Sequence, residues 1–135
     1  VIMSGAILAG CCRCGAVRYE IDGAGGGVSH CHCGMCRKAS GAAFLTWLGV
    51  AHDKFRYTRG APSSYRSSDT AHRSFCARCG SQLQFDYHGA HDNTHVTLGS
   101  LDEPGRLTPQ RHIWVSDRLP WADYGDSLPE FAGED

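Results

Sequence analysis

The sequence has no excess of charge of either sign. Its 135 residues include 13 Lys or Arg and 14 Asp or Glu, giving a formal net charge of −1 with neutral histidines. A chain without net positive charge has no general attraction for phosphates, so we expect no nucleic-acid partner. The adjacent cations Arg37 and Lys38 are a local exception that can still meet a small anion.

The sequence also lacks an apolar run of the roughly 20 residues that cross a membrane. The segment Val1–Ala9 carries no basic residue, and Ser4 and Gly5 interrupt its apolar residues. We therefore expect no export signal, although Leu8-Ala9-Gly10-Cys11 looks like a lipoprotein cleavage site. The interpretation is a cytoplasmic protein without a membrane partner, folded as one domain over residues 1–135.

Helical periodicity is scarce, whereas alternating and β-branched segments are frequent. The helical candidates are short, at 35–40 and 115–118. Strands are predicted at 17–21, 44–50, 55–58, 64–67, 82–87 and 94–101. The strand at 44–50 is apolar on both faces, which predicts a central position. The strands at 55–58 and 64–67 flank a turn and are predicted to form a hairpin. The fold class is mainly β with very little helix.

Cysteine, in contrast, is abundant, and three of the eight cysteines fall in the six residues Cys31-His32-Cys33-Gly34-Met35-Cys36. Thiols this close cannot easily pair as disulfides, which need converging Cβ vectors and separated Cα atoms. A turn can instead aim all three sulfurs at one zinc ion. Three ligands leave a tetrahedron incomplete, and an open position is typical of catalytic zinc.

The other cysteines favour a second zinc site that is closed by four thiolates. Cys76 and Cys79 form a Cys-x-x-Cys unit, and Cys12 and Cys14 form a tighter unit of the same kind. Such a site would tie the start of the chain to its middle, and its binding energy would be folding energy. The spacing equally allows Cys11 with Cys14, so either Cys11 or Cys12 can be the ligand.

A disulfide framework is the alternative interpretation of eight cysteines. Secreted scaffolds usually space their cysteines apart, whereas seven of these eight lie in Cys-x-Cys or Cys-x-x-Cys units. We therefore predict free or metal-bound thiols and a reducing compartment.

Three ordered motifs resemble the glutathione-dependent formaldehyde-activating enzymes, a family that includes relatives of centromere protein V. The motifs span residues 10–17, 31–38 and 73–80, with Gly41 and Phe44 after the second and a similar tail at 112–121. The resemblance implies a zinc-containing β-sheet fold similar to methionine-R-sulfoxide reductases. It implies a structural zinc at Cys12, Cys14, Cys76 and Cys79, and a catalytic zinc at Cys31, Cys33 and Cys36.

The chemistry expected at the three-thiol site follows from its charge and softness. Three thiolates on Zn²⁺ give a net charge of −1, a weak activator of water that suits a soft thiol as fourth ligand. The resemblance implies that glutathione adds to formaldehyde there, or that the carbon–sulfur bond of the adduct is cleaved. The expected partners are thus a small thiol and an aldehyde; the sequence does not predict the oligomeric state.

Several neighbouring side chains have two interpretations. His32 and His30 are predicted to face solvent, with a fourth-ligand or proton-shuttle role as the alternative for His32. Arg37 and Lys38 are predicted to bind glutathione carboxylates, with solvated surface charges as the alternative. Arg73 has the same two interpretations, a substrate-binding residue or a solvated surface charge. Core positions are predicted for Trp47, Trp114 and Trp121. The fold can also bring two histidines into the site, namely His72 and His112.

Three function classes therefore remain. A zinc-dependent carbon–sulfur lyase or thiol-adduct synthase is favoured. A non-catalytic zinc module would require His30, His32 or Cys11 to close the second site. A redox enzyme of the sulfoxide-reductase type would require a reactive cysteine outside both sites, and Cys11 is the candidate.

Overall fold

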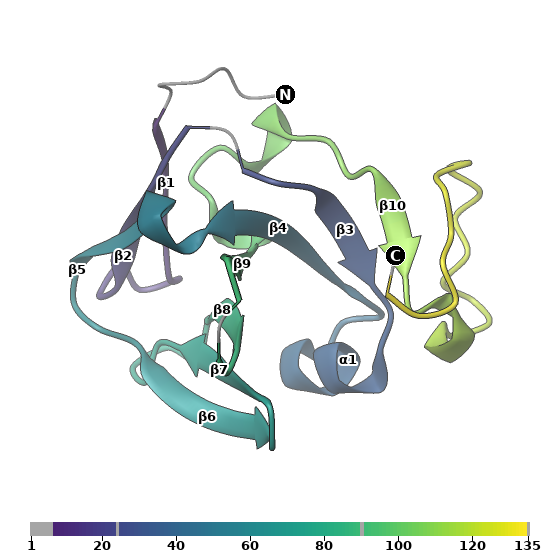
Figure 1. Ribbon diagram of the computed structural model, residues 1–135, viewed down its shortest axis with the longest axis horizontal. Helices are drawn as coiled ribbons and strands as arrows, with labels where there is room; N and C mark the ends of the chain where they lie inside the picture. The colour runs from purple at the N-terminus through teal and green to yellow at the C-terminus, as the bar shows by residue number, and fades with distance from the viewer. Residues whose placement is uncertain (1–6, 24, 90, 135) are drawn as a thin grey trace.

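Strands dominate the computed structural model, which describes residues 7–23, 25–89 and 91–134 (Figure 1). The mainly β prediction is confirmed, whereas the likeness to methionine-R-sulfoxide reductases and the single domain over 1–135 stay predictions. The interpretation of Val1–Ala9 falls largely outside the described residues. The strands in chain order are β1 (Ile7–Cys11), β2 (Arg18–Asp22), β3 (Val28–Cys31), β4 (Leu45–Ala51), β5 (Phe55–Arg59), β6 (Ser63–Ser68), β7 (Ala71–Phe75), β8 (Gln82–Tyr87), β9 (Asn93–Thr97) and β10 (Arg111–Ile113).

The strands form two sheets. The larger has the order β10-β3-β4-β9-β8-β7-β6, and the smaller has the order β1-β2-β5. Neighbouring strands are antiparallel except for β10 and β3, which pair in parallel. Figure 1 shows β3 and β10 side by side, with the C-terminal segment beyond β10. The chain therefore returns from its C-terminal third to the strand that carries Cys31.

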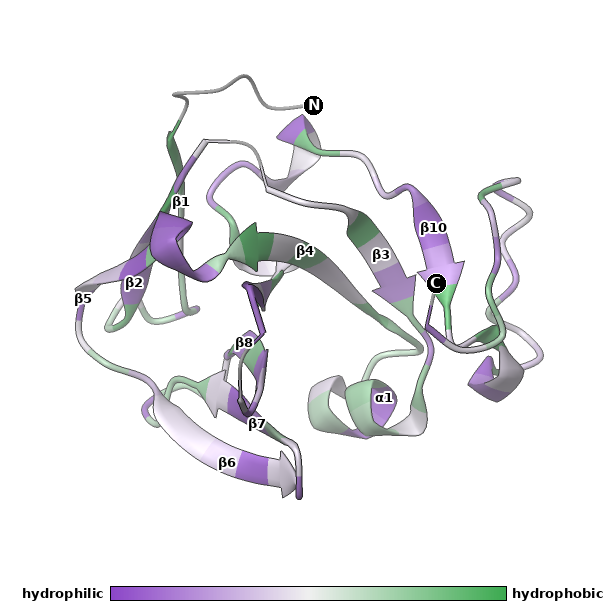
Figure 2. Cartoon of the chain, viewed as in Figure 1, coloured by the Kyte–Doolittle hydropathy of each residue, from purple (hydrophilic) through white to green (hydrophobic). Residues whose placement is uncertain are grey.

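The central position predicted for 44–50 is confirmed, because β4 lies between β3 and β9. Successive side chains of a strand point to opposite faces. Leu48 belongs to the larger hydrophobic core, and Trp47 belongs to a smaller one with Cys31, Cys36 and Ile113. The hydrophobic end of β4 is visible in Figure 2. Both faces of β4 are thus covered, and the smaller core surrounds the cysteines of the second motif.

The predicted hairpin of 55–58 with 64–67 is wrong. β5 pairs with β2 in the smaller sheet, whereas β6 pairs with β7 in the larger sheet. The segment 60–62 is therefore a crossover between sheets. Local turn signals indicate that the chain reverses, but strand partners are chosen by burial against distant segments.

Other element predictions differ in extent. The predicted strand 94–101 ends at Thr97 and continues as the 3₁₀ turn η2 (Leu98–Ser100), and the helix predicted at 115–118 is the 3₁₀ turn η4 (Val115–Asp117). Two more such turns, η1 (His52–Lys54) and η3 (Pro104–Arg106), connect strands. The strands β1, β3, β7 and β10 were not predicted. Among the described residues, no helix has the length and apolarity to span a membrane.

The predicted helix after the second cysteine motif is confirmed as α1 (Gly34–Ser40). Cys33 is its N-cap, and its sulfur accepts a hydrogen bond from the backbone N–H of Cys36 at 3.3 Å. Gly41 ends the helix in the left-handed region at φ 70°, and its N–H donates to Arg37 O. The helix is therefore fixed at both ends by the motif itself.

Candidate metal centres

Four cysteine sulfurs converge between the first and third motifs. The sulfurs of Cys12, Cys14, Cys76 and Cys79 lie within 4.8 Å of one another. Cys12 Sγ is 3.6 Å from Cys14 Sγ, and Cys14 Sγ is 3.8 Å from Cys76 Sγ. A Zn–S bond of 2.3 Å places tetrahedral sulfurs about 3.8 Å apart. The four-cysteine cluster thus has the donor set and the spacing that a tetrahedral zinc ion needs.

Two glycine turns shape this cluster. Gly15 and Gly80 have φ values of 79° and 80°, a region that glycine enters without steric cost. Their N–H groups donate back to Cys12 O and Cys76 O, at 3.1 and 2.7 Å. Each turn folds its cysteine pair around a common point. The -Cys-Gly- ending of both motifs is the sequence signal for this geometry.

The ambiguity between the two adjacent cysteines resolves geometrically. Cys12 is buried within the cluster, whereas Cys11 Sγ lies 3.9 Å from Asp102 Oδ1. Alternation along the chain end of β1 directs the two side chains to different sides. The sulfur of Cys12, and not that of Cys11, therefore lies in one cluster with the sulfur of Cys14.

The sulfur separations in the cluster do not match disulfides. All eight cysteines of the chain are described, and each is a free thiol in the structure. A disulfide needs an S–S distance of about 2.05 Å, far less than the sulfur separations in the cluster. Metal binding by these thiols stays a prediction.

The second motif forms a separate three-cysteine cluster. The sulfurs of Cys31, Cys33 and Cys36 lie within 4.8 Å of one another, and no other His, Cys, Asp or Glu ligand atom of the described chain joins that group. Cys31 ends β3, Cys33 caps α1, and Cys36 lies in its first turn. Two donors point at Cys36 Sγ: Trp47 Nε1 at 3.4 Å and Arg73 Nη2 at 3.5 Å.

Arg73 makes this cluster electropositive on one side. Its side chain is buried, and its Nε and Nη1 have no hydrogen-bond partner among the described residues. The guanidinium lies over Phe85, 4.9 Å from the ring centre. Hydrogen bonds from Cys31 and Cys33, with help from Arg73, lower the pKa of Cys36 to about 2. The same cluster raises the pKa values of Cys31 and Cys33, chiefly through the contacts among the three sulfurs. A buried cation is costly unless negative charge lies nearby, so the environment favours a thiolate at Cys36.

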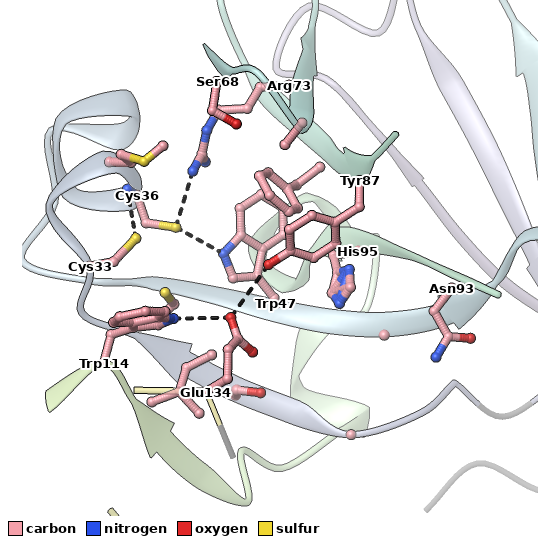
Figure 3. A pocket seen from close by; sticks show the side chains of 18 of the residues that line it. Cys33, Cys36, Trp47, Ser68, Arg73, Tyr87, Asn93, His95, Trp114 and Glu134 are labelled. Atoms are coloured by element: carbon pink, nitrogen blue, oxygen red, sulfur yellow. Dashed lines mark hydrogen bonds between the residues drawn. The ribbon is translucent and has the colours of Figure 1, made fainter. Parts of the chain in front are cut away.

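The three-cysteine cluster lines a cavity of about 720 Å³, and the four-cysteine cluster does not. Figure 3 shows Cys33 and Cys36 at the left, with Arg73 above them and Trp47 to their right. Ligand cavities usually have volumes between about 300 and 1,000 Å³. The four-cysteine cluster therefore lies apart from the cavity, with Cys12 and Cys76 buried and Cys14 and Cys79 exposed, while the three-cysteine cluster faces a space large enough for a small molecule.

The opposite side of the cavity holds residues that the sequence did not indicate. Glu134 Oε1 accepts hydrogen bonds from Trp114 Nε1 at 3.0 Å and from Tyr87 Oη at 3.5 Å (Figure 3). His95 and Arg111 also line the cavity. Tyr87, His95, Arg111 and Glu134 come from β8, β9, β10 and the C-terminal segment, and none of these four lies in a recognisable motif. Trp114 belongs to the tail at 112–121 and packs, partly buried, against the smaller core. Only the topology brings these residues together.

The prediction that His32 faces solvent is wrong. Its side chain is fully buried, and its Nε2 lies 2.8 Å from Nδ1 of His112, itself buried. His32 does point away from the cysteine sulfurs, as its position between two of them requires. The space on that side is filled by Phe44 and His112 rather than by water. Of the two histidines expected to be able to enter the site, His112 thus contacts the motif.

The remaining candidates divide as follows. Arg37 is half-buried and Lys38 exposed on α1, and neither is among the cavity-lining residues, so substrate binding by them stays a prediction. His30 is also half-buried and contacts Thr46, so it does not simply face solvent.

Trp47 is core as predicted and lines the cavity as well, whereas Trp121 is 67% exposed, which contradicts its core assignment. Trp121 follows Pro120 in a surface segment without regular secondary structure.

Comparison with known proteins agrees with this geometry. A crystal structure of a protein from Rhodobacter sphaeroides matches with a TM-score of 0.59 and 19% sequence identity, covering 91% of this chain and 98% of that one. At this identity the likeness shows the fold alone. Residues 7–117, which include all eight cysteines, match the family described as glutathione-dependent formaldehyde-activating enzyme. The chain therefore belongs to the glutathione-dependent formaldehyde-activating enzyme family.

Proposed function

We propose that the protein is a zinc-dependent carbon–sulfur lyase that forms or cleaves S-(hydroxymethyl)glutathione from glutathione and formaldehyde. The observation that supports this most strongly is the contrast between the clusters: only Cys31, Cys33 and Cys36 line the cavity. In this proposal the four-cysteine cluster holds a structural zinc, and the three-cysteine cluster holds a catalytic one. Free thiols throughout the chain suit a reducing compartment such as the cytoplasm.

The residues around the three-cysteine cluster suit a thiol substrate. Zinc held by three thiolates would offer its fourth position to a soft sulfur and favour the thiolate form. Arg73 supplies a fixed positive charge beside Cys36, which offsets the negative charge gathered there. Trp47 donates to the same sulfur and holds it in place. These two donors act as positioning residues, because they contact the ligand sulfur.

The cavity suits a zwitterionic molecule of tripeptide size. Its lining combines the cations of Arg73 and Arg111 with the carboxylates of Asp117 and Glu134, between the rings of Tyr87 and Trp114. Glutathione carries two carboxylates and one ammonium, so both signs of charge are needed to bind it. Holding thiol and aldehyde together in one cavity supplies the orientation that the bimolecular addition lacks in water.

The two other function classes find less support. A non-catalytic zinc module would need a fourth protein ligand, but His32 Nε2 is turned to His112 and Cys11 lies beside Asp102. A redox enzyme would need a reactive thiolate at Cys11. Cys11 Sγ lies 3.9 Å from Asp102 Oδ1, and the neighbouring cation Arg18 is paired with that same carboxylate at 2.7 Å, so its charge is already offset.

An exchange experiment at equilibrium tests the proposal. Thiols add to formaldehyde without a catalyst, so the rate of interconversion between glutathione and its adduct must be compared with and without protein, for example by NMR exchange spectroscopy. We expect the protein to accelerate exchange, Cys33→Ser to abolish the acceleration, and Cys11→Ser to keep it. Exchange equal to that in buffer would rule out glutathione and formaldehyde as substrates.

A further inference from the structure

A third group of potential metal ligands lies on the face of the larger sheet opposite the cavity. It consists of His30, His112 and Asp126, whose ligand atoms lie within 4.8 Å of one another. His30 of β3 and His112 of β10 are direct partners across the parallel pair. The next residues, Cys31 and Ile113, belong to the core beside the cavity. Alternation along both strands therefore places the two histidines together on the other face.

Each histidine is oriented as a metal ligand would be. Metal-binding imidazoles usually hydrogen-bond through one nitrogen and coordinate through the other. His30 Nδ1 lies 2.7 Å from Thr46 Oγ1, and His112 Nδ1 lies 2.8 Å from His32 Nε2. The two ring centres are 4.9 Å apart. Nε2 is therefore the coordinating nitrogen that each ring has to offer.

Asp126 completes the group from the C-terminal segment, which lies beyond β10 in Figure 1. Its Oδ2 is 2.9 Å and its Oδ1 is 3.2 Å from His112 Nε2. Oδ1 also accepts from the backbone N–H of Leu128 at 3.1 Å, which fixes the carboxylate. The Asp126 side chain is 37% exposed, whereas that of His112 is 4% exposed. An ion could thus enter from solvent and meet an otherwise buried imidazole.

We propose that His30, His112 and Asp126 form a binding site for a divalent first-row transition-metal ion, separate from both cysteine clusters. Two imidazoles and one carboxylate suit Zn²⁺, Fe²⁺, Co²⁺ or Ni²⁺, and they leave further coordination positions open. The ring of Phe44 packs on both histidines, and the ring of Tyr124 packs on Phe44 from outside. The site contacts the three-cysteine motif through the hydrogen bond between His112 and His32. An ion bound there would therefore help to fix the position of His32 between Cys31 and Cys33.

The direction of that hydrogen bond gives the site a distinct signature. When His112 Nε2 donates to Asp126, His112 Nδ1 must accept from His32. With an ion on Nε2, neutral His112 carries its proton on Nδ1 and donates to His32 Nε2. The His32 proton then resides on Nδ1, a buried atom without another partner. Ion binding thus reverses one buried hydrogen bond, whereas a permanent hydrogen-bonded network would not change.

The test adds Co²⁺ to the full-length protein whose cysteine clusters have been saturated with Zn²⁺. We expect one equivalent to bind with visible d–d absorption but no sulfur-to-metal charge-transfer band. Its proton NMR spectrum should show two solvent-exchangeable, hyperfine-shifted imidazole N–H signals, one each from His30 and His112. Asp126→Asn and His30→Gln should weaken this binding by more than about 100-fold, since each removes a direct ligand.

His72→Gln is the matched control, because His72 Nε2 also lies near a carboxylate, 3.7 Å from Asp86 Oδ2, but outside the group. It should bind Co²⁺ as the unaltered chain does. Thermal unfolding of each variant checks that the fold is retained. Absence of a third equivalent, or equal affinity in Asp126→Asn, would show that the three side chains form a hydrogen-bonded network only.

Discussion

Arg73 Nη2 lies 3.5 Å from Cys36 Sγ, which joins the third sequence motif to the second through a buried guanidinium. The contact spans 37 residues and crosses from β7 to α1. It explains the arginine at the start of the third motif. The third motif therefore contributes to the three-cysteine cluster as well as to the cluster that its own cysteines form.

Arg73→Met is expected to lower activity and metal affinity at the three-cysteine cluster by about 10- to 100-fold, the usual effect of losing a partner of a metal ligand. Methionine keeps much of the apolar contact with Phe85 but removes the charge. Arg66→Met, an exposed position on β6, serves as control and should change neither. Competition with a zinc chelator measures the affinity. An unchanged affinity in Arg73→Met would show that Arg73 does not support metal binding at this cluster.

Cys76→Ser and Cys33→Ser are expected to separate folding from catalysis. Losing a ligand of the four-cysteine cluster should lower the free energy of unfolding by more than about 4 kcal/mol, as loss of a folding metal does. Serine at position 33 still caps α1, because a hydroxyl accepts the Cys36 N–H as the sulfur does. Urea unfolding followed by circular dichroism gives both values. Equal destabilisation would contradict the division into structural and catalytic sites.

The three-cysteine cluster is expected to release its metal first. Its ligands lie within six residues and face the cavity, whereas the other cluster joins segments 62 residues apart. A chromogenic chelator should therefore remove zinc in two phases, and Cys33→Ser should lack the fast phase. If the fast phase instead disappeared in Cys76→Ser, the order of lability would be reversed.

His95 is expected to make the protein less stable in acid. Burial lowers the pKa of His95 below its ordinary value of 6.5. Because the folded state binds this proton more weakly than the unfolded state, stability is full above about pH 6.5 and falls as the pH drops toward the folded-state pKa. The slope is at most about 1.4 kcal/mol per pH unit for one proton. His95→Gln, compared with the unaltered chain at pH 5, 6 and 7 in excess zinc, should show a shallower dependence; identical slopes would exclude His95.

Sequence reasoning found the parts of this protein that depend on local spacing. The turns at Gly15 and Gly80, the helix after Cys33 and the apolar strand β4 follow from neighbouring residues. It failed where contacts between segments distant in the sequence determine the structure. β5 looked like the partner of β6 but pairs with β2, a strand much earlier in the sequence.

The burial of His32 failed for a related reason. Its direction, away from the sulfurs, followed from the motif. What lies in that direction is β10, a three-residue strand that pairs in parallel with β3 and carries His112. A strand of that length has almost no periodicity to detect. The residues opposite Cys36 in the cavity, such as Glu134 and Tyr87, were missed in the same way, because no motif contains them.

The open coordination position is the property on which the proposed reaction most depends, and cobalt substitution tests it directly. With Co²⁺ in the three-cysteine cluster, added glutathione should increase the sulfur-to-metal charge-transfer absorption, because a fourth sulfur joins three. Cys31→Ser should lose this response. Cys11→Ser should retain it, since Cys11 lies beside Asp102 and outside both clusters. His32→Ala is a less simple variant, because it leaves His112 Nδ1 buried without its partner, a loss of about 1–3 kcal/mol in stability. A spectrum that does not change at saturating glutathione, in a protein whose four-cysteine cluster keeps its zinc, would mean that the three cysteines do not offer a position to this thiol.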